Sequence, residues 1–493
     1  MSGEEPAGSA IRRDRFSGGP ARSFLSSLSA DERIFEADLA VDRAHVLMLA
    51  EQGIVNAEST AAILRALAEI EAAEFGALPN GEDVHEAIET AVIDRVGPEG
   101  GRMHTARSRN DEVATCIRYR LRGDLLEAIE AVCGLREALL TSAAEHVSTT
   151  MPGHTHLQPA QPTTLAHYLC SYEAALRRDT ERLFDAYGRT NRSPLGAGAF
   201  AGTTFDVDRE WTAELLGFES VLENSMDAVS TRDSCFESVA ALAGLATTLS
   251  GLAEDVIHFA NRDYLTLADE YASTSSIMPQ KKNPDTLELV RAAAGEASAG
   301  LDGLSTTLKG LPRAYNRDLQ AVTPHVWRTV DTVIEATDVT AGAIATARWN
   351  EAELADAAAE GFSTATGVAD LLASQGVPFR TAHEVVASAA ERLGSAELAD
   401  PEAQRAAIEA AAEDLLEDPL ESYVSREALL TALDPEESVA SRDSMGGPAP
   451  QAVREALENA REALADDGEA LTERRETLAV AEGTLDREVS AYL

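Results

Sequence analysis

Residues 236–259 (FESVAALAGLATTLSGLAEDVIHF) decide the fold class of this chain. Their large apolar side chains recur every three or four positions from Val239 to Phe259, and no proline interrupts them. This spacing places the apolar groups on one face of a helix, whereas a strand would alternate them. Gly244 and Gly251 leave room for a neighbouring helix to approach closely. The stretch therefore predicts a long helix packed among other helices.

Four more stretches have helical character: residues 125–139, 163–187, 284–311 and 325–348. Thr163 or Thr164 is a candidate N-cap for the second of these, because a hydroxyl can accept from a free amide of the first turn. Helices of about 25 residues would each span nearly 40 Å, a length typical of helix bundles. Several are apolar on more than one face, which predicts that the bundle forms the core of an oligomer.

The regions on either side of the bundle are expected to be separate helical domains. Residues 31–75 have the pattern of short helices with a break at Gly53. After Phe362 the helices become shorter, acidic and rich in alanine, and no convincing run of alternating strand residues occurs. We predict an all-α protein of three helical domains: residues 1–110, a central long-helix bundle at 111–361 that assembles into a tetramer core, and residues 362–493.

Charge excludes several classes of partner. The 493 residues include 41 lysines and arginines against 84 aspartates and glutamates, so the formal net charge is −43. Such a surface would repel nucleic acid and anionic membranes. The acidic residues are spread along the chain and predict a solvated surface. Because the Debye length falls to about 3 Å at roughly 1 M salt, we hypothesise a salt-rich cytoplasm, as in halophiles.

The cysteines and the N-terminal residues bear on the compartment. Cys116, Cys133, Cys170 and Cys235 are far apart and form no C-x-x-C pair, so neither a zinc site nor a disulfide framework is expected. The first fifteen residues are polar, unlike a signal peptide, and we expect no segment to cross a bilayer. The prediction is a cytoplasmic protein that holds no metal.

Three polar segments interrupt the helical pattern: residues 100–111 (GGRMHTARSRND), 153–162 (GHTHLQPAQP) and 273–285 (STSSIMPQKKNPD). The third contains Lys281 and Lys282, and Lys309 is the only other lysine of the chain. Arginine replaces lysine at little cost on a plain surface, so this retention suggests a point charge that a planar guanidinium cannot supply. A flexible basic loop is the alternative interpretation. The polar side chains of this segment could bind carboxylates.

The other two segments offer acid–base and carboxylate-binding groups. The His-x-His pair in the second could ligate a metal, but no acidic residue or cysteine is near enough in sequence to complete a site. We favour a structural role for His154 and an acid–base role for His156, because imidazole titrates near neutrality. Ser108, Arg109 and Asn110 could clamp a carboxylate. The alternative for Arg109 is a surface ion pair with the aspartate that follows Asn110.

The third segment resembles the signature loop of the fumarase/aspartase superfamily, and its form MPQKKNPD is similar to that of argininosuccinate lyases. The other two segments look like the family's other active-site blocks. Further blocks follow in the family's order: residues 15–19 (RFSGG), 83–89 (DVHEAIE), 311–320 (LPRAYNRDLQ) and 441–454 (SRDSMGGPAPQAVR). The resemblance implies cleavage of argininosuccinate to arginine and fumarate, the last step of arginine biosynthesis. It also implies a homotetramer whose active sites are shared between subunits, with no cofactor.

The resemblance also implies roles for individual residues. Ser275 would remove the proton next to a carboxylate, its hydroxyl activated by cationic groups and backbone dipoles. Lys281 and Asn283 would stabilise the carbanion-like intermediate, and His156, paired with Glu288, would be the general acid or its organiser. The substrate would be held by Ser108, Arg109, Asn110, Thr155, Arg232 and Ser276 at the succinyl carboxylates and by Ser27, Tyr315 and Gln320 at the arginine half, with His85 and Gln158 in support.

The chain departs from the family pattern at three positions. Thr274 replaces the glycine that usually precedes the paired serines, Glu112 replaces a glutamine, and Thr323 stands where a substrate-binding lysine is common. One alternative function is another fumarate-releasing lyase of the superfamily, for example one acting on adenylosuccinate, although the Gln-Lys-Lys of the loop argues against it. A non-catalytic structural protein of the crystallin kind is the other alternative, and the complete set of catalytic residues argues against that.

Overall fold

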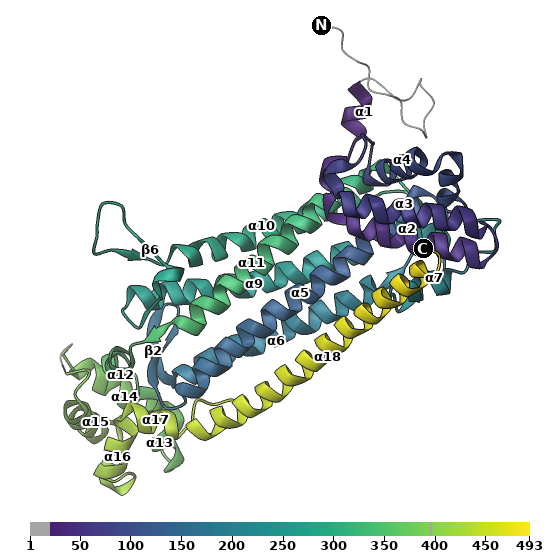
Figure 1. The fold of residues 1–493 in the computed structure, drawn as a ribbon. Helices are drawn as coiled ribbons and strands as arrows, with labels where there is room; N and C mark the ends of the chain where they lie inside the picture. Colours follow the sequence, from purple (N-terminus) through teal and green to yellow (C-terminus); the bar gives the residue numbers. More distant parts are fainter. Residues whose placement is uncertain (1–19, 395–396) are drawn as a thin grey trace.

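Five long helices lie side by side at the centre of the molecule (Figure 1). The computed structural model describes residues 20–394 and 397–493, so the block at residues 15–19 lies outside the described part. The five helices are α5 (Arg109–Glu145), α6 (Leu165–Thr190), α9 (Asp233–Asn261), α10 (Asp285–Leu308) and α11 (Thr323–Thr346). Each corresponds to a stretch predicted from the sequence, and the all-α fold class is confirmed.

The sequence explains where these helices begin. At the start of α5 the Asp111 carboxylate accepts a 2.8 Å hydrogen bond from the amide of Ser108, the N-cap residue. At the start of α6 the hydroxyl of Thr164 accepts a hydrogen bond from the amide of His167 at 3.1 Å. Thr164 is therefore the N-cap, one of the two candidates predicted from the sequence. Such caps satisfy groups that a helix end leaves unpaired. The apolar stripe of α9 is buried in the main core.

Helix α9 departs from one expectation. By length and composition it is apolar enough to cross a membrane, so the prediction that no segment could do so was wrong on that criterion. However, 56% of the apolar stretch is buried inside the molecule, among the other long helices. The same apolar composition is what a helix at the centre of a bundle requires.

Short helices cover one end of the bundle (Figure 1). They are α1 (Pro20–Leu25), η2 (Leu28–Ile34), α2 (Phe35–Glu51), α3 (Ala57–Ala73), η3 (Phe75–Ala77), α4 (Val84–Val96) and η4 (Pro98–His104). The chain breaks between α2 and α3 at Gly53, whose φ of +68° is costly for any residue with a side chain. Helix α2 packs against both α4 and α5, and this packing brings residues far apart in the sequence into one site.

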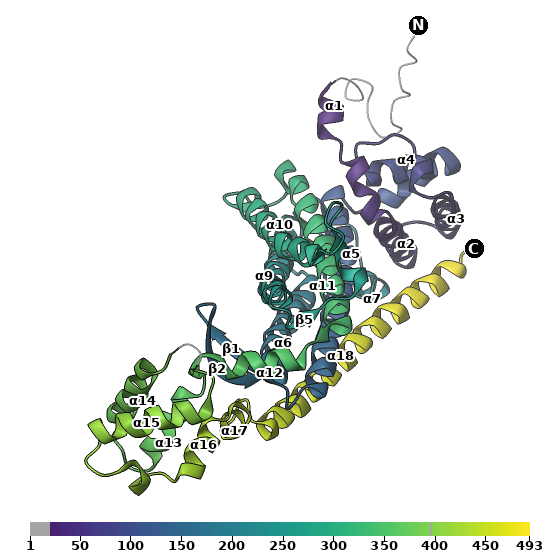
Figure 2. The same ribbon diagram turned by 90° about the vertical axis from the view of Figure 1, so that its left-hand side faces the viewer.

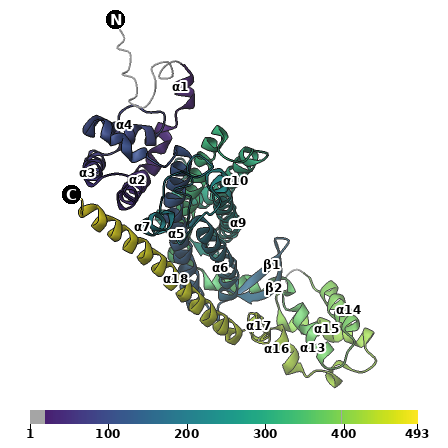
Figure 3. The same ribbon diagram turned by 90° about the vertical axis from the view of Figure 1, so that its right-hand side faces the viewer.

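A second, smaller core lies beyond the opposite end of the bundle (Figure 2). It is built by α13 (Ala365–Ser374), α14 (Phe379–Arg392), α15 (Pro401–Leu415) and α16 (Arg426–Leu433), with η7 (Glu360–Phe362) and η8 (Leu420–Ser422). Helix α12 (Glu351–Ala359) connects it to the bundle, and α17 (Pro435–Ala440) follows α16. The last helix, α18 (Pro450–Ser490), leaves this core and runs back along α5 and α6 (Figure 3). We therefore propose that α18 be grouped with the central bundle, while the boundary near residue 362 stays a prediction.

The few strands are short and form pairs. Strands β1 (Thr150–Thr155) and β2 (Gln158–Thr164) form an antiparallel hairpin, and β6 (Ser273–Thr274) pairs with β7 (Lys282–Asn283). Strand β3 (Arg192–Ser193) pairs with β4 (Ser220–Val221), near α7 (Arg209–Leu215) and α8 (Ser225–Ser230), and β5 (Leu265–Thr266) pairs with β8 (Arg348–Trp349). The sequence did not predict the β1–β2 hairpin, because its prolines are unfavourable in a strand that is paired on both sides.

Candidate active site

A cavity of about 190 Å³ opens at the end of the bundle that the short helices cover. Seven residues predicted from the sequence line it: Ser27, His85, Arg109, Asn110, Arg232, Tyr315 and Gln320. Six further polar or aromatic residues complete much of its wall: Asp31, Glu82, Asp83, Arg317, Thr323 and Trp327. Five separate stretches of the chain therefore meet here, and the cavity mixes acidic with basic side chains.

The start of α5 forms one side of this cavity. The Asp111 carboxylate accepts from the amides of Gly196 and Gly198 at 3.0 and 2.9 Å, which fixes the helix start against a neighbouring loop. Arg109 and Asn110 follow the capping residue and line the cavity. A helix N-terminus carries partial positive charge and free amides, both of which favour an anion. The Arg109 guanidinium lies 3.5 Å from the Asp83 carboxylate, so it is held loosely enough to accept another partner.

Arg232 is a buried cation on the same cavity. Its side chain is 4% exposed and donates to the backbone carbonyls of Thr231 and Val229, at 2.9 and 3.4 Å. Its Nε is buried without a hydrogen-bond partner, and within the described residues no carboxylate pairs with the guanidinium. Burial lowers the pKa of Arg232, since removal from water disfavours its charge. An unpaired buried guanidinium is suited to an anionic ligand.

The opposite wall brings together the residues predicted for the arginine half. Ser27 donates to the Asp31 carboxylate at 2.8 Å, and Gln320 donates to the carbonyl of Leu25 at 3.1 Å. Thr323, the residue expected to replace a substrate-binding lysine, lines the cavity. Arg317 lies on the same wall and pairs with Glu82, so a cation is present although the lysine is missing.

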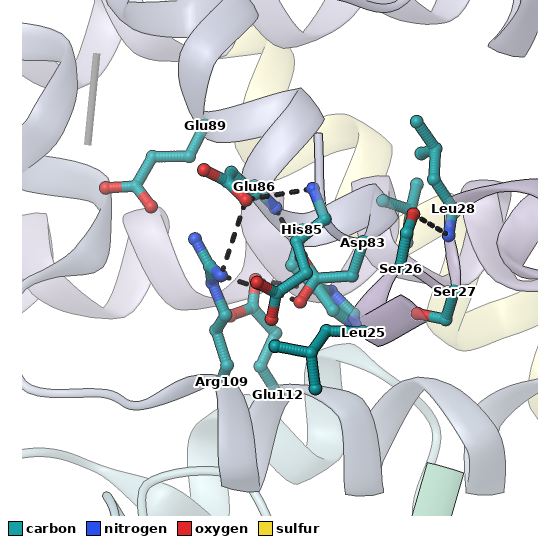
Figure 4. Close-up of polar contacts among 12 residues, drawn as sticks. Leu25, Ser26, Ser27, Leu28, Asp83, His85, Glu86, Glu89, Arg109 and Glu112 are labelled. Carbon is teal, nitrogen blue, oxygen red and sulfur yellow. Dashed lines mark hydrogen bonds and ion pairs between the residues drawn. The ribbon is translucent and has the colours of Figure 1, made fainter. Parts of the chain in front are cut away.

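Behind the cavity lies a dry cluster of charged groups that the sequence did not reveal. The Asp38 carboxylate is 2.8 Å from Nδ1 of His85, and Arg107 is 2.5 Å from Asp42 and 3.0 Å from Glu112. All five side chains are at most 7% exposed. Figure 4 shows His85, Glu112 and Arg109 between the start of α5 and the residues that precede η2.

Two sets of groups in this cluster have ligand atoms within 4.8 Å of one another, a spacing that a metal ion could use. One set is Asp38, His85 and Cys116, and the other is Asp38, Asp42 and Glu112. Arg107 already supplies a positive charge to two of these carboxylates, and His85 faces the third. We therefore assign the cluster as a network of ion pairs.

The remaining predicted residues lie elsewhere in the same chain. Thr155, His156 and Gln158 lie at the tip of the β1–β2 hairpin, where His156 and Leu157 have φ angles of 56° and 62°. Both residues carry side chains, which makes this left-handed turn costly and is a common feature of functional sites. The side chain of Leu157 is 61% exposed. Among the described residues, no hydrogen bond joins His156 to Glu288 within this one chain. Their pairing therefore stays a prediction.

The signature loop between β6 and β7 is exposed (Figure 1). The Ser275 hydroxyl oxygen accepts from the amides of Ile277 and Met278 at 3.3 and 3.1 Å. Two amide dipoles directed at one oxygen favour its ionised form. The Lys281 ammonium donates to the side-chain oxygen of Asn283 in the same loop. Ile277 is 84% exposed although it is apolar, as expected of a loop that covers a ligand or a neighbouring chain.

The loop and the cavity are separated by the length of α10. The loop immediately precedes this helix, and the far end of α10 lies near the cavity, against η6 (Arg317–Ala321). A helix of 24 residues spans roughly 36 Å. The structure therefore brings six of the predicted substrate-binding residues together at the cavity. It leaves Thr155, Ser276 and Asn283 with the predicted base and acid, far from that cavity.

Comparison with known proteins places this arrangement in a class. A family model for lyases matches residues 22–298, and the model of the argininosuccinate lyase C-terminal region matches residues 362–440. The solved structure of EDDS lyase in complex with formate is 34% identical, covers 96% of both chains and gives a TM-score of 0.85. A class II fumarase from Schistosoma mansoni, 14% identical with a TM-score of 0.68, shares the fold. The fold and the matched model define a lyase of the fumarase/aspartase superfamily.

Full-length relatives identify the particular family. Argininosuccinate lyase of Natronomonas pharaonis is 65% identical over 100% of this chain and 99% of its own length. That of Haloarcula marismortui is 63% identical over 98% of this chain and 96% of its own. The chain belongs to the argininosuccinate lyase family, whose members are carbon–nitrogen lyases, and these two relatives come from halophilic archaea.

Proposed function

We infer that this enzyme cleaves argininosuccinate into arginine and fumarate, as the last step of arginine biosynthesis. The observation that carries this inference is the full-length identity above 60% to argininosuccinate lyases, together with the intact signature loop. The mixed charge of the cavity agrees with it. A substrate with several carboxylates, an ammonium and a guanidinium needs both basic and acidic partners, and the cavity offers Arg109 and Arg232 beside Asp31 and Asp83.

The reaction begins with proton removal from the carbon next to a succinyl carboxylate. We assign the base to Ser275, because the amides of Ile277 and Met278 already stabilise negative charge on its oxygen. Electron density then moves into the carboxylate, where Lys281 and Asn283 would balance it. The carbon–nitrogen bond breaks as the guanidinium nitrogen takes up a proton, and His156 with Glu288 would supply or organise that proton. A positioned acid contributes roughly 10²–10⁴-fold.

Substrate binding is assigned to the cavity and to the hairpin. Arg109, Arg232 and Asn110 offer donors for the succinyl carboxylates, with Ser108 holding the helix start in place. The remaining assignments are Thr155 and Ser276 at the succinyl half and Ser27, Tyr315 and Gln320 at the arginine half, with His85 and Gln158 in support. The chemistry as assigned uses side chains and backbone dipoles of the protein.

The separation of these groups in one chain supports the proposal of a homotetramer with shared sites. In one chain the cavity lies about the length of α10 from the loop, so a complete site needs a loop and a hairpin from other subunits. The half-exposed face of α10 supports this assignment: Leu289, apolar and 73% exposed, lies on it. Packing of long helices between subunits would cover such a face.

The first experiment is to follow fumarate by ultraviolet absorbance when argininosuccinate is added to the enzyme in concentrated KCl. We expect a steady rise with argininosuccinate and none with adenylosuccinate or malate. A rise with another succinyl substrate alone would overturn the assignment of substrate. The same assay across KCl concentrations tests the salt hypothesis. Activity and tetramer size should both fall as KCl is removed, because 84 acidic residues then repel one another without screening.

A further inference from the structure

His85 is a buried side chain on the wall of the cavity. It is 4% exposed, and its ring nitrogen Nδ1 lies 2.8 Å from the Asp38 carboxylate and 3.7 Å from that of Glu112. The other ring nitrogen, Nε2, is buried and has no hydrogen-bond partner among the described residues. Nδ1 faces Asp38 and His85 lines the cavity, so Nε2 is the ring nitrogen that has no facing carboxylate in the described part of the chain.

Without a proton on His85, the negative charges around this residue outnumber the positive ones. Asp38, Asp42 and Glu112 are three carboxylates with oxygens within 4.8 Å of one another, and within the described part of the chain Arg107 is the only guanidinium among them. Three negative charges and one positive charge cannot stay unneutralised away from water. A proton on His85 removes one of the two excess charges. A proton shared between Asp42 and Glu112 removes the other.

The pKa values of these groups agree with a cluster that holds these two protons. Burial disfavours the charged imidazole, but the adjacent Asp38 carboxylate outweighs burial and raises the pKa of His85 to about 10. Burial raises the pKa of Asp42 to about 7 and that of Glu112 well above its usual value, with Arg107 opposing both changes. The pKa of Asp38 is lowered despite burial, because the His85 imidazolium stabilises its carboxylate.

Every element packed around His85 presents titratable or charged groups to this region. From η2 and α2 these are Asp31, Asp38, Asp42 and His45; from α4 and its N-cap they are Asp83, Glu86 and Glu89; from η4 and the segment after it they are His104 and Arg107; and from the first turns of α5 they are Arg109, Glu112 and Cys116. His45 and His104 have pKa values lowered to about 3 and about 4, with burial as the main cause, so they stay neutral.

We propose that Asp38 is a positioning residue that holds His85 as an imidazolium, with Nε2 directed at a carboxylate of the substrate in the cavity. The proposal rests on the proposed function for the identity of that ligand. Asp38 itself does not line the cavity, so it would act only through His85. The thiol of Cys116 donates to the other Asp38 oxygen at 3.4 Å, a weak contact from a neutral donor.

The kinetic test is a double-mutant cycle of Asp38→Asn and His85→Asn, with Cys116→Ala as the control. All variants are assayed with argininosuccinate in concentrated KCl, after tetramer size and thermal midpoint have been checked. We expect each single variant to raise KM about 10- to 100-fold, the usual loss for a charge-assisted hydrogen bond, with a smaller change in kcat. The double variant should be no worse than His85→Asn alone, because Asp38 acts through His85. Cys116→Ala should stay within about threefold of the wild type, because it removes no charge.

Independent multiplication of the two single effects would overturn the proposal, and so would a Cys116→Ala variant as impaired as Asp38→Asn. A pH series separates positioning from mere structural support. In Asp38→Asn the increase in KM should become larger as pH rises from 6 to 8, because the imidazole then loses its proton. In the wild type KM should change little over that range.

A second measurement needs neither activity nor a variant of Asp38. Histidines labelled with ¹³C at Cε1 are titrated by NMR in the wild-type tetramer, and His85→Asn identifies the His85 signal among the ten histidines. We expect His85 to remain protonated at pH 8. A His85 signal that titrates near pH 6.5 would sink the proposal even if the lyase activity is present. A wild-type enzyme that releases no fumarate would instead overturn the proposed function, while the NMR result would still decide the charge of His85.

Discussion

The two ends of the helix bundle differ in how tightly their polar groups are held. At the end covered by α2 and α4, Asp38, Asp42, Arg107 and Glu112 are each at most 7% exposed and tied to one another. At the other end the signature loop beside β6 projects from the bundle (Figure 1), and the β1–β2 hairpin projects there too (Figure 2). Among the described residues, the hydroxyl of Ser275 there hydrogen-bonds only to amides of its own loop. Under the proposed assignments, the groups that bind the substrate lie in rigid packing, whereas the reacting groups lie on exposed segments.

Neither end forms a complete site in one chain. In the described part of the chain, the residues that line the cavity include no predicted base. The loop that carries the predicted base lies at the other end of α10. A rigid binding end favours pre-organised recognition, while a loop that closes can exclude water before proton transfer. The predictions below test this division of roles, from the largest expected effect to the smallest.

Removal of the predicted base should have the largest effect. Ser275→Ala should lower kcat by roughly 10²–10⁴-fold with little change in KM, since the hydroxyl serves chemistry and not ground-state binding. Ser422→Ala, at an exposed serine of the smaller core that donates only to a backbone carbonyl, is the matched control and should behave as wild type. Wild-type turnover by Ser275→Ala would show that another group is the base.

Mixed tetramers test whether the two ends act across subunits. Ser275→Ala and Arg109→Gln should each be inactive, but co-expression should restore activity at about one site in four, where an intact loop meets an intact cavity. The measurement is fumarate release by purified mixed tetramers. A mixture of Arg109→Gln with Asn110→Ala damages the same end twice and should recover nothing. Equal inactivity of both mixtures would place each complete site within a single chain.

The charged cluster predicts that stability depends on pH above neutrality. The pKa of His85 is raised to about 10 in the folded state, so its stabilising proton is fully bound below its unfolded value and is lost as pH rises towards 10. The thermal midpoint should therefore fall between pH 7 and pH 10, since each tenfold difference in proton affinity between the folded and unfolded states is worth about 1.4 kcal/mol. His85→Asn should flatten this decline. Cys116→Ala is the control. In the lower part of that pH range, where the wild-type thiol is uncharged, its thermal midpoint should change with pH as that of the wild type does.

The smallest expected effect concerns the departure at Thr274. This residue pairs with Lys282 in the short β6–β7 ladder that supports the loop. Thr274→Gly should loosen the ladder by roughly 0.5–1 kcal/mol, because glycine is unfavourable in a strand. We expect kcat to change by less than about threefold, with a measurable change in the rate of loop closure by stopped-flow fluorescence of a label at position 277. An effect as large as that of Ser275→Ala would mean that Thr274 takes part in the chemistry.

Local patterns in the sequence predicted much of the fold and the identity of the active segments. Apolar spacing located all five long helices, and a candidate cap located the start of one of them at Thr164. The sequence did not predict the cap at Ser108, which the structure shows. The β1–β2 hairpin was missed, because strand patterns are weak where Pro159 and Pro162 interrupt them. The course of α18 was not evident either. Its sequence is as acidic and alanine-rich as the domain before it, yet its apolar residues belong to the main core.

The sequence by itself determined the helical class, the three polar segments and the family, because periodicity, capping and signature residues are encoded within short stretches of chain. Only the tertiary structure placed Asp38 and Asp42 of α2 beside His85 of α4 and Glu112 of α5. It also separated Ser275 from the cavity by the length of α10. The physical reason is that the charge of a buried group depends on its neighbours in space. Those neighbours are set by how the helices pack, and no local pattern records that packing.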